Sequence, residues 1–294
     1  MRFQRIAYFI DSFKKLAMLQ SKSCPACGSY NTFHLKRKYL CTSLRLCNDC
    51  HLMFRYPKDN LFDNIEYYQS LYQEGFTTSL PDEKHIANLI NNDFNNSTKD
   101  FSNYIAILKS LRRNTGMSLL DFGCSWGYGT YQLKEAGFNA VGFEISEPRA
   151  DYGRNLGMKI FSNRNKLKEA YPQGFDILFN AHVLEHLPDF YGVFEWFDSL
   201  IKPGGLFIAF CPNGNLKRIS IIGEKLHEIW GKKHPMLIDS SFLKFYFTRM
   251  GWKSRFSSSP FNLEEIKEWP NGAEVVPNKE IGDELLAAAW KPFY

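Results

Sequence analysis

Four cysteines near the N-terminus occur in two pairs whose spacing suits a metal ion. Cys24 and Cys27 form one C-x2-C pair, Cys47 and Cys50 form a second, and 19 residues separate the pairs. Four thiolates at this spacing bind Zn²⁺ tetrahedrally in zinc ribbons and leave no open position for catalysis. Two disulfides are the alternative, but nothing in the sequence signals secretion, and thiols in the cytosol stay reduced. We therefore expect one structural zinc ion.

A glycine-rich turn lies between two apolar runs near the middle of the chain. Gly123, Gly127 and Gly129 follow the first run, a short helix is expected next, and the second run ends at Glu144. Glycines let the backbone come close to a ligand, and a helix N-terminus offers unpaired N–H donors. An acid at the end of the second strand can accept hydrogen bonds from ribose hydroxyls. The pattern therefore predicts the first half of a nucleotide-binding βαβ unit.

Two other enzyme classes use similar turns, and the rest of the sequence fits neither of them. Gly123, Ser125 and Gly127 also spell the G-x-S-x-G nucleophile elbow of hydrolases, which needs an acid and then a histidine downstream. The last histidine, His234, is followed by 60 residues, and no oxyanion segment of the HGGG type lies upstream. A short-chain nicotinamide oxidoreductase needs a Tyr with a Lys four residues later, and the sequence contains no such pair. Both classes are therefore disfavoured.

The segment from Asp121 to Gly129 resembles motif I of the class I S-adenosylmethionine (SAM) methyltransferases, in which an acid precedes the glycine turn. SAM carries an ammonium and a sulfonium, so a carboxylate attracts it, whereas a pyrophosphate would be repelled. Ser125 departs from the family, which usually has glycine there. Further segments match the family in order: 181–189 with its Leu-Glu-His, the loop 202–205 and the strand 206–210. The core is also similar to methyltransferase type 23 domains.

The resemblance covers about residues 116–294 and implies a fold, a cofactor and its contacts. The fold class is α/β, with a Rossmann-like seven-stranded methyltransferase sheet that ends in a reversed hairpin. SAM is the implied cofactor. The implied cofactor-binding residues are Asp121, Gly123, Cys124, Gly127, Gly129, Glu144, Ile145 and Asn180. A zinc ribbon ahead of such a core is also similar to sugar C-methyltransferases of deoxysugar pathways.

Three histidines are candidates for the chemistry of transfer. Methyl transfer is an in-line displacement, and an alcohol, enol or carbon acid acceptor also needs a base nearby. We expect His234 to be this base, because related enzymes place a histidine of such a loop on the substrate side. His186, with Glu185 beside it, is expected to anchor the loop behind the cofactor. His182 is expected to shape the methionine end of the pocket.

The resemblance favours a small or carbohydrate-like acceptor, such as a nucleotide-linked sugar or a surface glycan precursor, and so a role in polysaccharide biosynthesis. Two alternatives stay open. A zinc-ribbon RNA or protein methyltransferase is favoured by charge, because residues 1–60 hold 11 Lys and Arg against 3 Asp and Glu, a net charge of +8. The slightly acidic remainder of the chain argues against nucleic acid. A non-catalytic SAM-binding scaffold is the third possibility.

The elements that position these residues divide the 294-residue chain into four parts. We expect an N-terminal amphipathic helix (1–20), the zinc ribbon (21–57), a helical lid or linker (58–115) and the methyltransferase domain (116–294). Tyr67, Tyr68 and Tyr72 would lie on the lid. No apolar run reaches transmembrane length, and Arg5 and Asp11 interrupt the first helix, so we expect a cytoplasmic protein. Residues 1–20 could still contact a membrane surface peripherally.

Overall fold

The computed structural model of this chain describes residues 2–17, 20–38, 40–59, 80–111, 113–223, 226–231, 234–271 and 281–293. The tyrosines expected on the lid, Tyr67, Tyr68 and Tyr72, lie outside these residues. Part of the expected lid segment forms two helices, α3 (Glu83–Asn91) and α4 (Ser102–Ser110). None of the described helices is long and apolar enough to cross a membrane.

Seven strands form the large sheet, in the order β10-β11-β8-β7-β4-β5-β6. Their bounds are β4 (Ser118–Phe122), β5 (Asn139–Phe143), β6 (Ile160–Phe161), β7 (Phe175–Ala181), β8 (Ile201–Pro212), β10 (Lys253–Ser258) and β11 (Glu284–Trp290). Strands β4 to β8 pair in parallel, whereas β11 is antiparallel to both of its neighbours. The strand order reverses direction at β4 and β7, so their carboxyl ends form the switch point where open α/β sheets bind ligands. The predicted seven-stranded sheet with its reversed hairpin is confirmed.

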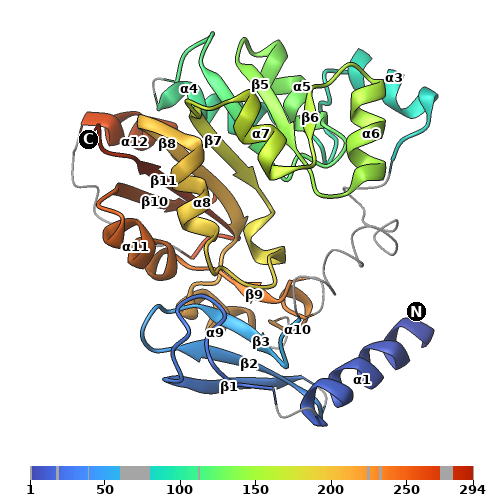
Figure 1. Cartoon of the computed structure of the whole chain (residues 1–294), viewed down its shortest axis with the longest axis vertical. Helices are drawn as coiled ribbons and strands as arrows, with labels where there is room; N and C mark the ends of the chain where they lie inside the picture. Colours follow the sequence, from blue (N-terminus) through green and yellow to red (C-terminus); the bar gives the residue numbers. More distant parts are fainter. Residues whose placement is uncertain are drawn as a thin grey trace.

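Alternating apolar residues divide the sheet into two buried faces. Leu120 and Leu178 pack into one hydrophobic cluster, whereas Leu119 and Ile177 pack into the other. Successive side chains of a strand point to opposite faces, so a continuous apolar run is needed when helices cover both faces. Figure 1 shows helices on both faces of this sheet. The covering helices are α4, α5 (Tyr128–Glu135), α6 (Glu147–Asn155), α7 (Arg164–Ala170), α8 (Val193–Leu200), α11 (Ser240–Arg249) and α12 (Leu263–Glu268).

A smaller sheet carries the paired cysteines and lies at one end of the large sheet (Figure 1). Its order is β1-β2-β3-β9, with bounds β1 (Thr32–Lys38), β2 (Thr42–Cys47), β3 (Met53–Tyr56) and β9 (Met236–Leu237). Strand β9 comes from the second half of the chain and pairs antiparallel with β3. The helices α9 (Leu216–Ile222) and α10 (Leu226–Ile229) lie beside this sheet, and α1 (Arg2–Ala17) begins the chain. The fourth strand of the ribbon sheet therefore belongs to the predicted methyltransferase region.

The ribbon and the methyltransferase fold share one hydrophobic cluster. Cys47 and Phe54 of the ribbon are buried in the same cluster as Phe190, Phe194 of α8 and Phe242 of α11. These three phenylalanine rings also contact one another, with centroids 4.9 to 6.1 Å apart. A shared apolar core resists relative motion because separating the two parts would expose this surface to water. The ribbon therefore packs as part of the fold and not as a module on a free linker.

Candidate functional site

The glycine turn after β4 adopts backbone conformations that only small residues reach without strain. Gly123 has φ of 79° and Gly127 has φ of 85°, both in the left-handed region. A Cβ atom on Gly123 would lie 2.3 Å from Cγ2 of Val183, so that position also lacks room for a side chain. Ser125 has φ of 52°, in the same region. This explains why glycine suits the position of Ser125, where the sequence departs from the family pattern.

Two buried acids flank the turn from adjacent strands. Oδ2 of Asp121 accepts a hydrogen bond of 2.7 Å from the hydroxyl of Thr130. The oxygens of Glu144 accept the backbone N–H groups of Ser125 at 3.0 Å and Ser146 at 2.8 Å. A carboxylate oxygen has two lone pairs, so each oxygen of Glu144 can still accept a ribose hydroxyl. The two acids together make a buried negative region that suits a cationic ligand.

Burial has changed the proton affinity of both acids. It raises the pKa of Asp121 to about 7, the Thr130 hydrogen bond opposes this rise, and the charge of Glu144 adds to it. Burial also raises the pKa of Glu144, while the N–H of Ser146 and the charge of Arg149 lower it. Desolvation disfavours an ionised carboxylate unless a cation compensates it. A bound sulfonium or ammonium would supply that compensation.

The remaining predicted cofactor residues have different surroundings. Asn180 at the end of β7 is fully buried, and neither atom of its amide has a hydrogen-bond partner in the described parts of the chain. Buried amides are normally bonded, so this one is positioned to meet a polar ligand. Ile145 is 39% exposed. Cys124 contacts Gly142, and Gly129 lies against the Phe101 ring.

A cluster of glutamates and histidines begins directly after the end of β7. Nε2 of His182 lies 2.8 Å from Oε1 of Glu284, and its Nδ1 lies 3.5 Å from Oε1 of Glu185. The hydroxyl of Tyr104 donates a 2.7 Å hydrogen bond to the same oxygen of Glu284. Burial lowers the pKa of His182, but the hydrogen bonds and charges of the two glutamates raise it to about 10. His182 is therefore an imidazolium at neutral pH in the free protein.

His186 and His234 meet on the other side of Glu185. Their ring centroids are 4.7 Å apart, and Nε2 of His186 lies 3.9 Å from Oε1 of Glu185. Burial lowers the pKa of His234 to about 4, and the neighbouring His186 contributes to that decrease. The sequence placed His186 behind the cofactor and His234 on the substrate side, but in the structure the two side chains are neighbours. All three predicted histidines surround one buried carboxylate.

Two members of this cluster were not among the sequence candidates. Tyr104 lies on α4 and Glu284 begins β11, 180 residues later in the chain. Neither residue belongs to a motif, and no local spacing connects them. The parallel register of β7 with β8, and the antiparallel register of β8 with β11, bring Glu284 to the edge where β7 ends. Strand pairing across the sheet places Glu284, and the packing of the Tyr104 ring against Phe179 and Phe210 of the sheet places Tyr104.

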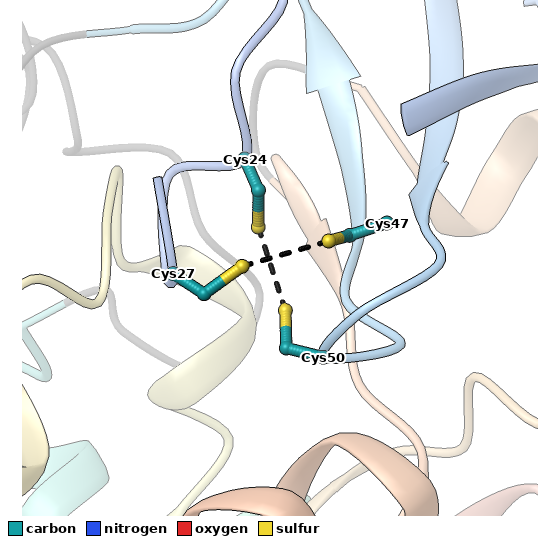
Figure 2. A group of neighbouring side chains, drawn as sticks. All are labelled: Cys24, Cys27, Cys47 and Cys50. Carbon is teal, nitrogen blue, oxygen red and sulfur yellow. Dashed lines mark hydrogen bonds between the residues drawn. The ribbon is translucent and has the colours of Figure 1, made fainter. Parts of the chain in front are cut away.

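The four paired cysteines converge on one point, as Figure 2 shows. The sulfurs of Cys24 and Cys50 are 3.5 Å apart, those of Cys27 and Cys47 are 3.6 Å apart, and all four lie within 4.8 Å of one another. Zn–S bonds of about 2.3 Å in a tetrahedron give sulfur separations of about 3.8 Å. All seven cysteines are free, so no disulfide competes for these sulfurs. The cluster fits a four-cysteine zinc site.

The ribbon contacts both segments that carry the histidine cluster. The N–H of Phe190, four residues after His186, donates a 3.1 Å hydrogen bond to the carbonyl of Pro25 between the first pair of cysteines. The N–H of Arg55 donates a 2.7 Å hydrogen bond to the carbonyl of Pro235, next to His234. Pairing of β3 with β9 begins one residue later, at Met236. The positions of His186 and His234 are therefore coupled to the ribbon.

Comparison with known proteins identifies similar sequences and folds. A family described as "Methyltransferase domain" matches residues 98–263. The ubiquinone biosynthesis O-methyltransferase of Methylococcus capsulatus is 30% identical over 117 residues, which are 37% of this chain and 49% of that protein. The phosphoethanolamine N-methyltransferase 1 of Zea mays is 24% identical over 160 residues, 50% of this chain and 28% of that protein. The chain thus spans at most about half the length of these curated relatives.

A solved structure supports the same fold. The plantazolicin methyltransferase BpumL in complex with SAH (S-adenosylhomocysteine) aligns with a TM-score of 0.50 and 16% identity, covering 78% of this chain and 94% of that one. At this identity the likeness concerns the fold.

Proposed function

Since this chain belongs to the methyltransferase-domain family that its residues 98–263 match, and is a SAM-dependent methyltransferase, we propose that it methylates a hydroxyl group of a small acceptor. The observation that carries this proposal is the adjacency of two sites at the switch point. The glycine turn follows β4, and Glu144 follows β5. The glutamate and histidine cluster begins two residues after Asn180 of β7, the strand that pairs with β4. A methyl donor and an acceptor bound at these sites would be neighbours, as in-line transfer requires.

SAM is proposed to bind along the turn between the two acids. Glu144 would accept hydrogen bonds from the ribose hydroxyls, and Asp121 would face the cationic methionine part of the cofactor. The unpartnered amide of Asn180 would bond to the same end of SAM. Glu144→Ala should weaken SAM binding by about 1.5–3 kcal/mol, the range for hydrogen bonds to a charged group. Calorimetry of wild type and variant measures this loss.

The acceptor hydroxyl is proposed to approach the cluster around Glu185. His182 is protonated at neutral pH because its pKa is about 10, so it serves as a positioning residue between Glu185 and Glu284. The pKa of His234 is about 4, so its imidazole is neutral and retains a lone pair. We therefore keep His234 as the residue that acts on the acceptor side, as the sequence predicted. An oxygen acceptor also agrees with the name of the O-methyltransferase relative from Methylococcus capsulatus.

The carbohydrate-like acceptor predicted from sequence stays a proposal about one class of hydroxyl compound. The relatives above are named for ubiquinone biosynthesis, phosphoethanolamine and plantazolicin, and these names lend no support to a sugar. Tyr67, Tyr68 and Tyr72, the tyrosines of the expected lid whose hydroxyls could bond to a sugar, lie outside the described residues. We propose a small hydroxyl acceptor and treat a nucleotide-linked sugar as one test compound.

The four cysteines are proposed to hold a structural Zn²⁺ that fixes the ribbon against the cluster. Zinc would fill its tetrahedron with Cys24, Cys27, Cys47 and Cys50 and so would take no part in the transfer. The contribution of the ribbon would be geometric, through its hydrogen bonds to the segments of His186 and His234.

Transfer of a labelled methyl group from SAM into a fractionated cell extract tests the proposed acceptor. Label in a small-molecule fraction, lost with the Glu144→Ala variant, is the expected result. Label in RNA or protein would support the zinc-ribbon alternative instead. SAM binding without transfer into any fraction would indicate a scaffold.

A further inference from the structure

The cluster around Glu185 has the donor set of a metal site that is separate from the four cysteines. One carboxylate oxygen of Glu185 and one ring nitrogen each of His186 and His234 lie within 4.8 Å of one another. Glu185 and His186 lie on the short 3-10 turn η2 (Leu184–His186), and His234 precedes β9. An ion with bonds of about 2.1 Å places adjacent ligand atoms about 3.0 Å apart. Side-chain movements of about 1 Å therefore bring the three atoms to bonding positions.

Glu185 is the observation that points to a missing ligand. Its side chain is 2% exposed. Neither of its carboxylate oxygens has a hydrogen-bond partner in the residues that the structure covers. The nearest ring nitrogens, on His182 and His186, are 3.5 and 3.9 Å away, so His182 makes at most one long hydrogen bond and the carboxylate keeps unused acceptor positions. A buried carboxylate without hydrogen bonds is costly, and buried charges are normally paired or coordinate a metal. Here the two imidazoles next to the carboxylate are themselves metal ligands.

We propose that Glu185, His186 and His234 bind one divalent first-row transition-metal ion. Two imidazoles and one carboxylate are ligands that Mn²⁺, Fe²⁺ and Zn²⁺ accept, whereas an all-oxygen set would suit Mg²⁺ or Ca²⁺. Three protein ligands leave coordination positions open, which is the arrangement of a catalytic and not a structural site. The four-cysteine cluster has no such position.

The role of this ion rests on the proposed function. An acceptor hydroxyl that occupies an open position binds through its oxygen, and the positive charge of the ion makes its proton more acidic. The proton leaves to water. The oxygen then forms its bond to the methyl carbon as the carbon–sulfur bond breaks, which yields a methyl ether and S-adenosylhomocysteine. In this arrangement His234 holds the ion that acts on the acceptor and does not itself take the proton.

Binding of Mn²⁺ to the zinc-loaded protein tests the site without any need for activity. Thiolate sites prefer zinc strongly over manganese, so the ribbon keeps its zinc during the titration. Electron paramagnetic resonance should show one bound Mn²⁺ per chain. Loss of a ligand in His234→Ala or in Glu185→Gln should weaken this binding at least about tenfold. His85→Ala removes an exposed histidine of α3 that is not one of the three proposed ligands, and it should leave Mn²⁺ binding unchanged.

Several outcomes would overturn the proposal. The proposal fails if wild-type protein binds neither Mn²⁺ nor Co²⁺ in addition to its ribbon zinc. It also fails if the His234→Ala and His85→Ala variants bind Mn²⁺ with equal affinity. Calorimetry with SAM shows whether each variant is folded. If His234→Ala is not folded, Glu185→Gln replaces it in the Mn²⁺ titration. Full methyl transfer by protein stripped of the second ion refutes the site but keeps the proposed function. Stoichiometric Mn²⁺ binding without transfer to any hydroxyl acceptor would support the metal site and refute the proposed function.

Discussion

Acidification should weaken SAM binding through the buried carboxyl group of Asp121, whose pKa lies nearest neutrality. Burial raises its pKa to about 7, the hydroxyl of Thr130 opposes this rise, and the charge of Glu144 adds to it. The carboxylate attracts the cationic groups of SAM only when it is ionised. Affinity must therefore fall as the pH falls through about 7. The two histidines with resolved shifts do not titrate in this range, since their pKa values are about 10 for His182 and about 4 for His234.

The size of the effect follows from the ionised fraction. With a pKa of about 7, Asp121 is about half ionised at pH 7 and about 3% ionised at pH 5.5. If only the ionised form binds, the dissociation constant of SAM rises about 16-fold over this interval, which is about 1.6 kcal/mol. Asp121→Asn should bind SAM weakly at every pH in the interval. Thr130→Val removes the hydrogen bond that lowers the pKa, so the midpoint of the profile should move to higher pH.

Calorimetric titration with SAM between pH 5.5 and 7.0 is the assay, with circular dichroism to show that the protein stays folded. Asp151→Asn, at an exposed acid of α6 that pairs with Arg154, is the matched control and should keep the wild-type profile. A wild-type affinity that does not change with pH would refute the reasoning. So would an Asp121→Asn variant that retains the wild-type pH dependence.

The same carboxyl group should affect stability with the opposite sign. The folded protein binds the proton of Asp121 more tightly than the unfolded chain, because the folded pKa is raised from 3.8 to about 7. Between these two values the folded state carries more protons, so this group makes the free energy of unfolding decrease as the pH rises. SAM should abolish that decrease if it stabilises the ionised form.

Three substitutions test other parts of the structure. Cys47→Ser should lose zinc by elemental analysis and lower turnover, because the ribbon holds the segments of both histidines, whereas the spare Cys41→Ser should keep its zinc. Gly123→Ala should lower the free energy of unfolding in urea by about 2–4 kcal/mol, since φ of 79° strains alanine and the new Cβ would lie 2.3 Å from Val183. Adding Val183→Ala should recover only the part due to this contact. His234→Ala should reduce single-turnover rates at least about 10- to 100-fold with SAM affinity nearly unchanged, because it removes a ligand of the ion that activates the acceptor. A near-normal rate would remove His234 from the acceptor side.

The sequence determined those features that depend on residues close together in the chain. The two C-x2-C pairs bring four sulfurs within 4.8 Å of one another. The acid, the glycine turn and the second acid also occupy the predicted positions at the ends of β4 and β5. The apolar runs before the turn and before Glu144 predicted β4 and β5, because a strand covered on both faces needs continuous apolar residues. Local spacing and periodicity are sufficient for each of these features. The other five strands of the sheet were implied by the resemblance to the class I SAM methyltransferases.

The tertiary structure decided which distant residues share the site and how the ribbon is attached. Tyr104 and Glu284 both contact His182, and neither residue belongs to a motif that could have predicted this. Strand β9 completes the ribbon sheet from residues 236–237, so the ribbon predicted as residues 21–57 takes a strand from beyond its expected end. Assigning His186 and His234 to opposite sides of the cofactor was reasonable from their loops, yet their rings are 4.7 Å apart. The physical reason is that sequence patterns report the conformation of a segment, whereas the packing of the whole chain sets the distance between two segments.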